Sequence, residues 1–257
     1  MFYVNRIAVA ALVVAGISSM ATPVKANENK QDENHITIGV GVLMEKDPFI
    51  DSETRDYPLP YISIQQGAYY FEGTETGVHF DTDEGGVTPG IDVYVAGRFL
   101  SGQDRGKITA DAGARLSLKT DYGTLSAEYR RDITDTFNGG ETIARYSIPI
   151  SMGKFTLTPA VQVNWMDRKT ANHMYGVTTK QQAKMINKGR DVILPLSQIN
   201  DDALNLGGDV TLTAQLNDRL TLFGVLSGAY LDKSIRNSAA VDQKWEASAI
   251  MGLGYTF

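Results

Sequence analysis

Ala249-Ile-Met-Gly-Leu-Gly-Tyr-Thr-Phe257 closes the chain, and its residues alternate in character. Every second residue, counted back from Phe257, is apolar or aromatic, whereas three of the four residues between them are small. A period of two indicates a β-strand with two different faces. A strand that meets lipid on one face and ends at a membrane interface explains both the alternation and the final aromatic ring. We therefore expect Tyr255 and Phe257 to form the C-terminal signal that the barrel assembly machinery of the outer membrane recognises.

The first 26 residues have the layout of a secretory signal peptide. Arg6 precedes a short apolar run, residues 7–17, and Val24-Lys-Ala26 supplies small residues at the cleavage positions. We expect cleavage after Ala26, with cleavage after Ala21 as the alternative. The apolar run is too short to span a bilayer as a helix. Residues 27–34 are wholly polar and predict a loose periplasmic tail.

Composition excludes several classes of protein. The chain has no cysteine, which excludes disulfides, thiol catalysis and Cys-ligated zinc. Without Arg6 and Lys25, 22 Lys and Arg remain against 30 Asp and Glu, a net charge of −8 that disfavours nucleic acid as a partner. The three histidines lack metal-binding spacing, and the acidic stretch 81–85 lacks the ligands of a calcium loop. We expect no enzyme, no metal and no cofactor; a Ser-His-Asp site assembled in space is the alternative.

From residue 36 onward, alternating runs are separated by turn residues, which predicts an all-β fold. Most runs exceed the about 5–6 residues typical of strands in soluble sheets and suit tilted membrane spans. We expect one domain, residues 35–257, folded as an antiparallel transmembrane β-barrel of about twelve strands, or ten if residues 68–82 do not cross the membrane. The expected strands are 36–44, 58–66, 68–73, 76–82, 90–99, 107–119, 123–131, 141–150, 154–165, 205–215, 219–231 and 244–257.

The connections between these runs fall into two length classes. Short turns are expected at Gly67, 120–123, 152–153 and 217–218, and longer connections at 45–57, 100–106, 132–140, 166–204 and 232–243. Barrels of this kind place short turns in the periplasm and long loops outside the cell. Pro159 lies inside the strand 154–165 and cannot donate to the ladder, so we expect a β-bulge there.

Charged residues on the polar faces of the strands are candidates for the lining of the barrel lumen. Two roles are open to them: pairing across neighbouring strands as a network that stiffens a narrow barrel, or lining a pore for small hydrophilic solutes. A barrel of about twelve strands lies between the filled and the open case. The candidates are Asp92, Arg98, Arg115, Glu128, Arg130 and Arg145, with Asp111, Lys119, Asp209 and Glu246 on the same faces.

The long loop 166–204 contains a basic strip. Thr178 and Gln181 have the spacing of a capping box, and a helix beginning there places Lys180, Lys184 and Lys188 on one face, followed by Arg190. Such a strip on the outer side would attract lipopolysaccharide phosphates or acidic glycans. The alternative is a solvated loop helix that needs its lysines only for solubility.

Several segments, in their order and spacing, resemble the MipA/OmpV family of outer-membrane proteins. These are Ile38-Gly-Val-Gly-Val42, Tyr57-Pro-Leu-Pro60, Tyr175-Gly-Val-Thr178 with Gln182-Ala183, and Gly252-Leu-Gly-Tyr-Thr-Phe257. The resemblance implies a barrel without catalytic residues, and one member is described as a scaffold that binds a lytic transglycosylase and a murein synthase. After Ala183 the chain departs from the family pattern, since Lys184-Met-Ile-Asn-Lys-Gly-Arg190 replaces the usual Ser-Gly-Leu-Pro stretch.

Together these features predict a protein of the bacterial outer membrane in contact with lipid and lipopolysaccharide. The resemblance implies a non-enzymatic scaffold or adaptor for murein-remodelling enzymes, a murein hydrolase and a murein synthase. A small-solute or antibiotic-permeable channel lined by the charges above is one alternative. A surface adhesin acting through residues 166–204 is another.

Overall fold

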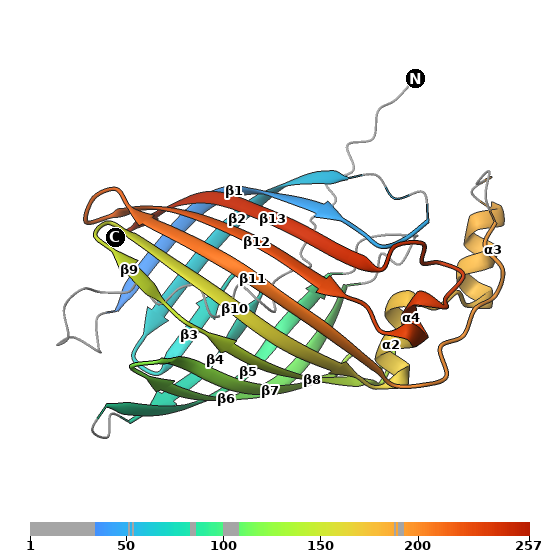
Figure 1. The fold of residues 1–257 in the computed structure, drawn as a ribbon, viewed down its shortest axis with the longest axis horizontal. Helices are drawn as coiled ribbons and strands as arrows, with labels where there is room; N and C mark the ends of the chain where they lie inside the picture. Colours follow the sequence, from blue (N-terminus) through green and yellow to red (C-terminus); the bar gives the residue numbers. More distant parts are fainter. Residues whose placement is uncertain are drawn as a thin grey trace.

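The computed structural model describes residues 34–50, 52, 54–82, 86–99, 108–187, 189 and 193–257. The predicted signal peptide and all of the predicted tail except Asn34 lie outside these residues. One 13-stranded antiparallel sheet dominates the described chain (Figure 1). Its strands are β1 (His35–Lys46), β2 (Arg55–Gln66), β3 (Tyr69–Glu72), β4 (Glu75–Asp81), β5 (Val87–Phe99), β6 (Ile108–Thr120), β7 (Gly123–Asp132), β8 (Gly140–Ser147), β9 (Ile150–Met152), β10 (Phe155–Met166), β11 (Ala203–Gln215), β12 (Leu220–Tyr230) and β13 (Trp245–Thr256).

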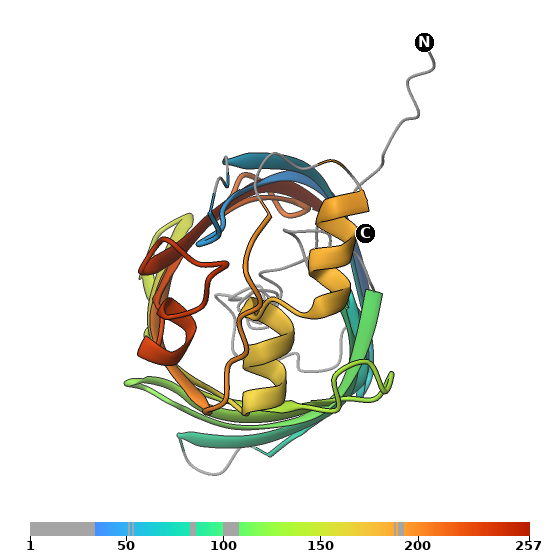
Figure 2. The same cartoon turned by 90° about the vertical axis from the view of Figure 1, so that its right-hand side faces the viewer.

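The sheet closes on itself as a barrel (Figure 2). The last strand pairs with the first, with Thr37 opposite Thr256 and Lys46 opposite Ala247. Strands β8 and β9 both pair with β10 and together make one position in the wall, so the barrel has twelve positions. The expected number of strands is therefore confirmed, and the hairpin β3–β4 accounts for the region where ten strands was the alternative.

The outer surface of the barrel is apolar because alternate residues of each strand point outward. On β1, Ile36, Ile38, Val40, Val42 and Met44 are 40–69% exposed, and the other strands repeat this pattern. Closure pairs the last strand with the first, and pairing of backbone groups is what a hydrocarbon environment favours. Among the residues that the structure describes, none of the helices has the length and hydropathy needed to cross a bilayer.

The bulge predicted at Pro159 is wrong. The register of β10 against β11 runs through Pro159 without a break, and β8 and β9 pair with β10 in one continuous register. Proline acts on the neighbouring strand instead. Ile148 donates its N–H to the carbonyl of Pro159 (3.0 Å), but Pro159 has no N–H to return, and the ladder is interrupted between β8 and β9.

The two ends of the barrel differ, and we name them for their connections. At the turn end lie the short turns, the C-terminus and Asn34, whose side chain accepts a hydrogen bond from Gly67 N–H (3.1 Å) (Figure 1). At the loop end lie the helices α2 (Arg168–Tyr175), α3 (Thr179–Asn187) and α4 (Lys233–Arg236) (Figure 2). The predicted capping box at the start of α3 is confirmed, because Gln181 N–H donates to Thr178 Oγ1 (3.3 Å) and Thr178 N–H to Gln181 Oε1 (2.7 Å).

Candidate functional site

The barrel interior has two chemically different walls, and one of them is ionic. The inward-facing charged residues of β4–β8 and β11 form what we call the ionic wall. Its strands present charges at alternate positions, so that side chains from different strands meet inside the barrel. Its members are Glu75, Asp92, Arg98, Asp111, Arg115, Glu128, Arg130, Glu141, Arg145 and Asp209, which are buried or nearly so.

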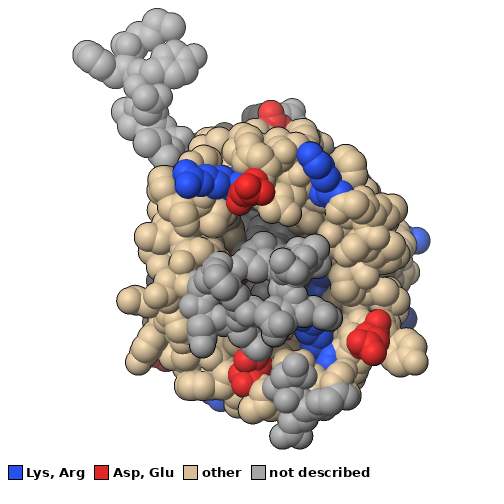
Figure 3. Space-filling model, turned by 90° about the vertical axis from the view of Figure 1, so that its left-hand side faces the viewer, with Lys and Arg blue, Asp and Glu red and all other residues tan. Residues whose placement is uncertain are grey.

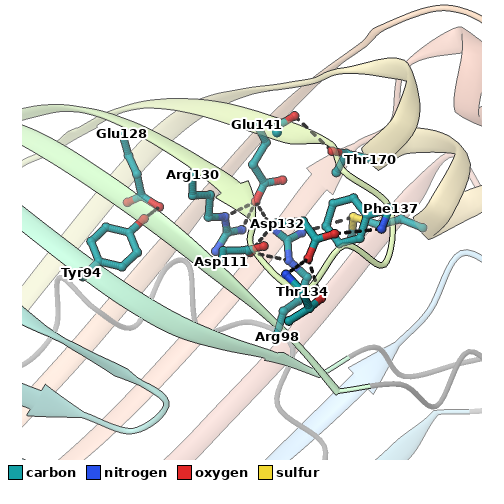
Figure 4. A network of polar contacts seen from close by, with 12 residues as sticks. Tyr94, Arg98, Asp111, Glu128, Arg130, Asp132, Thr134, Phe137, Glu141 and Thr170 are labelled. Carbon is teal, nitrogen blue, oxygen red and sulfur yellow. Dashed lines mark hydrogen bonds and ion pairs between the residues drawn. The ribbon is translucent and has the colours of Figure 1, made fainter.

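One cluster of the ionic wall lies toward the loop end (Figure 4). Arg98 Nε donates to Asp111 Oδ2 (2.7 Å), and Arg98 Nη2 donates to Glu141 Oε1 (2.9 Å). Arg130 donates to the same oxygen of Glu141, which is 1% exposed. Two guanidinium groups thus share one carboxylate, and the buried charges are compensated by one another.

A second cluster lies deeper in the barrel, around Arg115. Arg115 Nε donates to Glu128 Oε2 (2.8 Å), and its Nη2 lies 3.3 Å from Glu75 Oε2. Tyr94 donates its hydroxyl to Glu128 Oε1 (2.6 Å), and the Arg115 guanidinium lies 5.1 Å from the centre of the Tyr94 ring. Arg145 pairs separately with Asp209 across β10. Apart from Arg115–Glu128, these contacts join strands that are not neighbours, and together they stiffen this half of the wall.

The other wall is apolar and lies on β12, β13, β1 and β2. We define the apolar wall as six side chains: Leu43, Tyr57, Leu59, Phe223, Val225 and Ile250. Leu43, Val225 and Ile250 are the most deeply buried of these. The ring of Tyr61 lies 5.9 Å from that of Phe223 at the edge of this set. The lumen therefore presents hydrocarbon on one side and charge on the other.

The loop end of the barrel is covered by a cap, which we define as the described residues of 47–50, 166–203 and 231–241. Thirteen buried side chains form its core: Phe49, Met166, Ala171, Tyr175, Val177, Met185, Leu194, Ile199, Ala203, Leu231, Ile235, Ala240 and Val241. The helices of the cap lie across the mouth of the barrel (Figure 2). A hydrophobic cluster of this size ties three long connections together.

Polar contacts join the cap to the strands. Tyr175 donates its hydroxyl to Glu246 Oε2 of β13 (3.0 Å), and Ser238 donates to the Tyr175 carbonyl (2.5 Å). Asp167 accepts from Thr170 N–H (2.8 Å) at the start of α2 and from Gly140 N–H (2.9 Å) at the start of β8. The cap is thus fixed to the barrel wall at several points.

The loop after β7 connects the ionic wall to the cap. The Asp132 carboxylate accepts hydrogen bonds from the backbone N–H groups of Thr134 (2.9 Å), Phe137 (2.8 Å) and Asn138 (2.9 Å), which folds the loop tightly (Figure 4). Phe137 then stacks on His173 of α2, with ring centres 4.6 Å apart, and Arg98 lies 5.6 Å from its ring. Phe137 therefore connects helix α2 of the cap with Arg98 of the cluster around Glu141.

The sequence profile described as "MltA-interacting protein MipA" matches residues 38–257. This chain belongs to the MipA family. Among curated relatives it is 24% identical to the MltA-interacting protein of Escherichia coli strain K12 over 241 residues, which cover 88% of this chain and 91% of that protein. It is 20% identical to YiaT of Escherichia coli O157:H7, described as a candidate outer membrane protein, over 87% of this chain and 92% of the relative. Family and fold agree that the chain is an outer-membrane barrel.

Two solved structures show a distant similarity to this MipA-family barrel, with TM-scores below 0.5. One is an anion-selective porin from Comamonas acidovorans, with 8% identity, a TM-score of 0.43, and coverage of 88% of this chain and 99% of the porin. Another is the outer-membrane expressed OmpT of Vibrio cholerae, with 5% identity, a TM-score of 0.42, and coverage of 88% and 97%.

The structure brings together the six residues proposed for the lumen in two groups and one separate pair. Arg98 and Arg130 meet at Glu141, Arg115 lies between Asp92 (3.8 Å) and Glu128 (2.8 Å), and Arg145 pairs with Asp209. Their location fits both roles predicted from the sequence, an ionic network that stiffens the barrel and the lining of a pore. A conductance measurement distinguishes the two.

The other predicted site residues are spread over both ends of the MipA-family barrel. Lys180 and Lys184 are exposed on α3 at the loop end, whereas Lys188 and Arg190 lie outside the described residues. At the turn end the rings of Tyr255 and Phe257 lie 4.9 Å apart, and Phe257 N–H donates to the Ile36 carbonyl (2.9 Å). Their role as an assembly signal stays a prediction.

Sequence reasoning missed several residues of the interior. Glu141 was placed on a strand but not among the lumen residues, and Glu72 and Glu75 lie beside a tight turn where alternation is too short to read. Ile250 was the one large residue on the small face of the last strand, and this exception marks the apolar wall. Leu43 also belongs to the apolar wall, but it is followed by the exposed Met44, so the sequence shows no clear alternation that marks Leu43 as buried.

His79 is not arranged for nucleophilic catalysis. His79 Nδ1 lies 2.7 Å from Asp92 Oδ1, and its Nε2 lies 3.4 Å from Asp81 Oδ2. Both ring nitrogens thus face carboxylates, which leaves neither directed at a serine hydroxyl. Among the described residues no group of His, Asp or Glu side chains is arranged to hold a metal ion.

Proposed function

We propose that this protein is a non-enzymatic outer-membrane scaffold for murein-remodelling enzymes, with a lytic transglycosylase and a murein synthase as partners. The cap carries this proposal. Its hydrophobic core of thirteen side chains covers the loop end, and ion pairs join the strands beneath it. A stiff, capped barrel suits a platform better than a conduit. The name of the K12 relative, MltA-interacting protein, supports the choice of partner.

The turn end is the surface that we assign to the partners, because short turns of such barrels face the periplasm, where murein lies. Among the described residues, Tyr122 is the most exposed large hydrophobic side chain there, at 82%. Charged residues of both signs are scattered around this face (Figure 3). An exposed aromatic ring amid separated charges is suited to a specific but reversible protein contact.

Photo-crosslinking in intact cells tests the scaffold proposal. A photoreactive amino acid is introduced at Tyr122 or Asp218 at the turn end, and at Lys180 on the cap as the matched control. We expect a peptidoglycan enzyme to be captured from the turn end and not from Lys180. If normally inserted protein captured such enzymes only from Lys180, or from none of the three positions, the proposal would be refuted.

A small-solute channel is the second candidate, and the ionic wall is the observation that favours it. Planar-bilayer recordings separate the two functions. Steady unitary conductance of the wild-type protein would support the channel, whereas silence would support the scaffold.

A role for the basic strip in binding lipopolysaccharide or acidic glycans is a further proposal, based on the exposure of Lys180 and Lys184. Charge reversal of both residues should weaken binding to immobilised lipopolysaccharide if the strip acts in this way. Unchanged binding by the folded variant would assign the lysines to solubility alone.

A further inference from the structure

The wall of the barrel has a gap above the hairpin β3–β4. Strand β3 pairs with β2 only from Ser63 to Gln66, while β2 begins at Arg55. The hairpin ends where Gly73 N–H donates to the Ile62 carbonyl (2.9 Å) on one side and Gly97 N–H to the Thr74 carbonyl (2.8 Å) on the other. Beyond this level, no described strand pairs with residues 55–61 of β2 on the side away from β1.

This gap lies within the lipid-facing band and not above it. Pro60 and Pro58 of β2 are opposite Val40 and Val42 of β1, which point outward with 69% and 40% exposure. Met251 of β13, opposite Val42, is 58% exposed. The unpaired edge of β2 therefore faces hydrocarbon, where an unpaired backbone N–H is costly.

Two prolines remove donors from this edge. Because the Ile62 carbonyl points toward the hairpin, the alternate residues 60 and 58 direct their backbone groups to the same side. Both are proline, so neither presents an N–H to the gap. Proline at an edge also prevents another strand from pairing there. The edge is thus built to remain unpaired.

The interior behind the gap is amphipathic. Leu59 and Tyr57 of β2 point inward and join the apolar wall. Below them, at the tip of the hairpin, the Glu72 carboxylate is 9% exposed and accepts a hydrogen bond from Tyr61 (3.2 Å). No Lys or Arg of the described chain forms an ion pair with Glu72, although the adjacent Glu75 has Arg115 at 3.3 Å. A buried acidic side chain that lacks an ion-pair partner favours a ligand that supplies one.

We propose that this gap is a lateral passage from the outer leaflet to a binding site for a cationic amphiphile. The alkyl chain of the ligand lies along the apolar wall, and its cationic head reaches Glu72. The ligand class follows from the two surfaces that meet at the gap, hydrocarbon on one side and, on the other, a buried acidic side chain that has no ion pair with a described Lys or Arg. This site does not depend on the scaffold function, since it uses the lumen and not the turn end.

Binding of a defined probe tests the site. The full-length exported protein is placed in phosphatidylcholine nanodiscs and titrated with dodecyltrimethylammonium. Dodecyl sulfate is the control for the head group and butyltrimethylammonium the control for the chain. We expect dodecyltrimethylammonium to bind at least about tenfold more tightly than either control, because each control lacks either the positive head group or the long alkyl chain. Equal binding of the three probes would refute the site.

Two variants test the residues. Glu72→Gln should lose most of the preference for the cation, whereas Asp218→Asn, an exposed turn carboxylate, should keep it. Heat-modifiable migration on gels confirms that both variants are folded barrels. If folded Glu72→Gln kept the full preference, Glu72 would not be the anchor and the proposal would be wrong.

A labelling experiment tests the route. Because the chain has no cysteine, an introduced cysteine is its single thiol. Leu59→Cys places a thiol on the inner side of the gap, and Val225→Cys places one on the apolar wall further from it. A lipid-soluble alkyl maleimide should label position 59 faster than position 225, and dodecyltrimethylammonium should slow labelling at position 59. Equal rates at both positions, or no protection by the probe, would refute the lateral passage even if binding persisted.

Discussion

The ring of Tyr94 lies directly over Gly113, so that a Cβ at position 113 would collide with the ring. This close approach allows the Tyr94 hydroxyl on β5 to pass over β6 and reach Glu128 on β7 (2.6 Å). A glycine on the inner face of β6 thus makes room for a contact between strands that are not neighbours.

Gly113→Ala should therefore destabilise the barrel. Displacing the aromatic ring would cost about 1–3 kcal/mol, as overpacking of a well-filled interior usually does. Equilibrium unfolding by urea in detergent micelles measures the change. Gly224→Ala is the matched control, because the nearest atom to its added Cβ is 3.7 Å away, and it should be tolerated. Equal effects of the two substitutions would show that the Tyr94 contact is unimportant.

Glu141→Gln should destabilise more strongly. The substitution leaves Arg98 paired with Asp111 and removes the carboxylate with which Arg130 forms its ion pair. Removing one partner of a buried ionic cluster typically costs about 3–5 kcal/mol. The same unfolding assay applies, with the exposed Asp218→Asn as control. A loss as small as that of the control would mean that the cluster is already hydrated.

Disrupting the cap should open the loop end. Ile235 is completely buried in the cap core, so Ile235→Asp places a carboxylate among apolar side chains and should loosen the cap without altering the strands. Planar-bilayer recordings should then show conductance where the wild type is silent. Ile186→Asp on the exposed face of α3 (55% exposed) serves as control and should stay silent. Silence of a folded Ile235→Asp variant would show that the cap is not what closes the barrel.

Acid should weaken the connection 231–241 through Asp232. Partial burial opposes ionisation of Asp232, but hydrogen bonds from the Ser234 N–H (2.7 Å) and hydroxyl (2.7 Å) outweigh it and hold the pKa below its ordinary value of 3.8. Since the folded pKa is depressed, this contribution to stability is present above 3.8 and is lost as the pH falls through the folded pKa.

Comparison with Asp232→Asn measures this pH dependence. The wild type should unfold at a higher urea concentration than the variant near neutral pH, and the difference should shrink well below pH 3.8. A difference that persisted unchanged in acid would assign the contribution to side-chain shape and not to charge.

Alternation predicted the strands because lipid and lumen impose a period of two on every strand that crosses the membrane. The last strand shows the strength of this signal, since Met251 is outward and its neighbours Ile250 and Gly252 are buried. The short hairpin β3–β4 is also present, close to the expected strands 68–73 and 76–82. The bulge predicted at Pro159 was wrong because the missing N–H of proline interrupts the neighbouring strand, between β8 and β9. Strand β10 itself contains no extra residue.

The cap and the gap could not be read in the same way. Phe49, Tyr175 and Val241 are distant in sequence and have no shared periodicity, so their common core appears only in three dimensions. The gap depends on where the hairpin ends relative to Pro58 and Pro60, which is a matter of register. The role proposed for Glu72 could not be predicted for a related reason, because whether a carboxyl group has an ion-pair partner depends on its neighbours in three dimensions.

The pairing of β1 with β13 has a consequence for synthesis. Strand β1 bonds to β2 on one side and to the final strand on the other, from Thr37 opposite Thr256 onward. The barrel cannot close until the last strand has been synthesised. A nonsense mutation near the 3′ end of the message would therefore leave β1 and β12 as two unpaired strand edges. Such truncated products should be cleared by periplasmic proteases and never accumulate as smaller barrels.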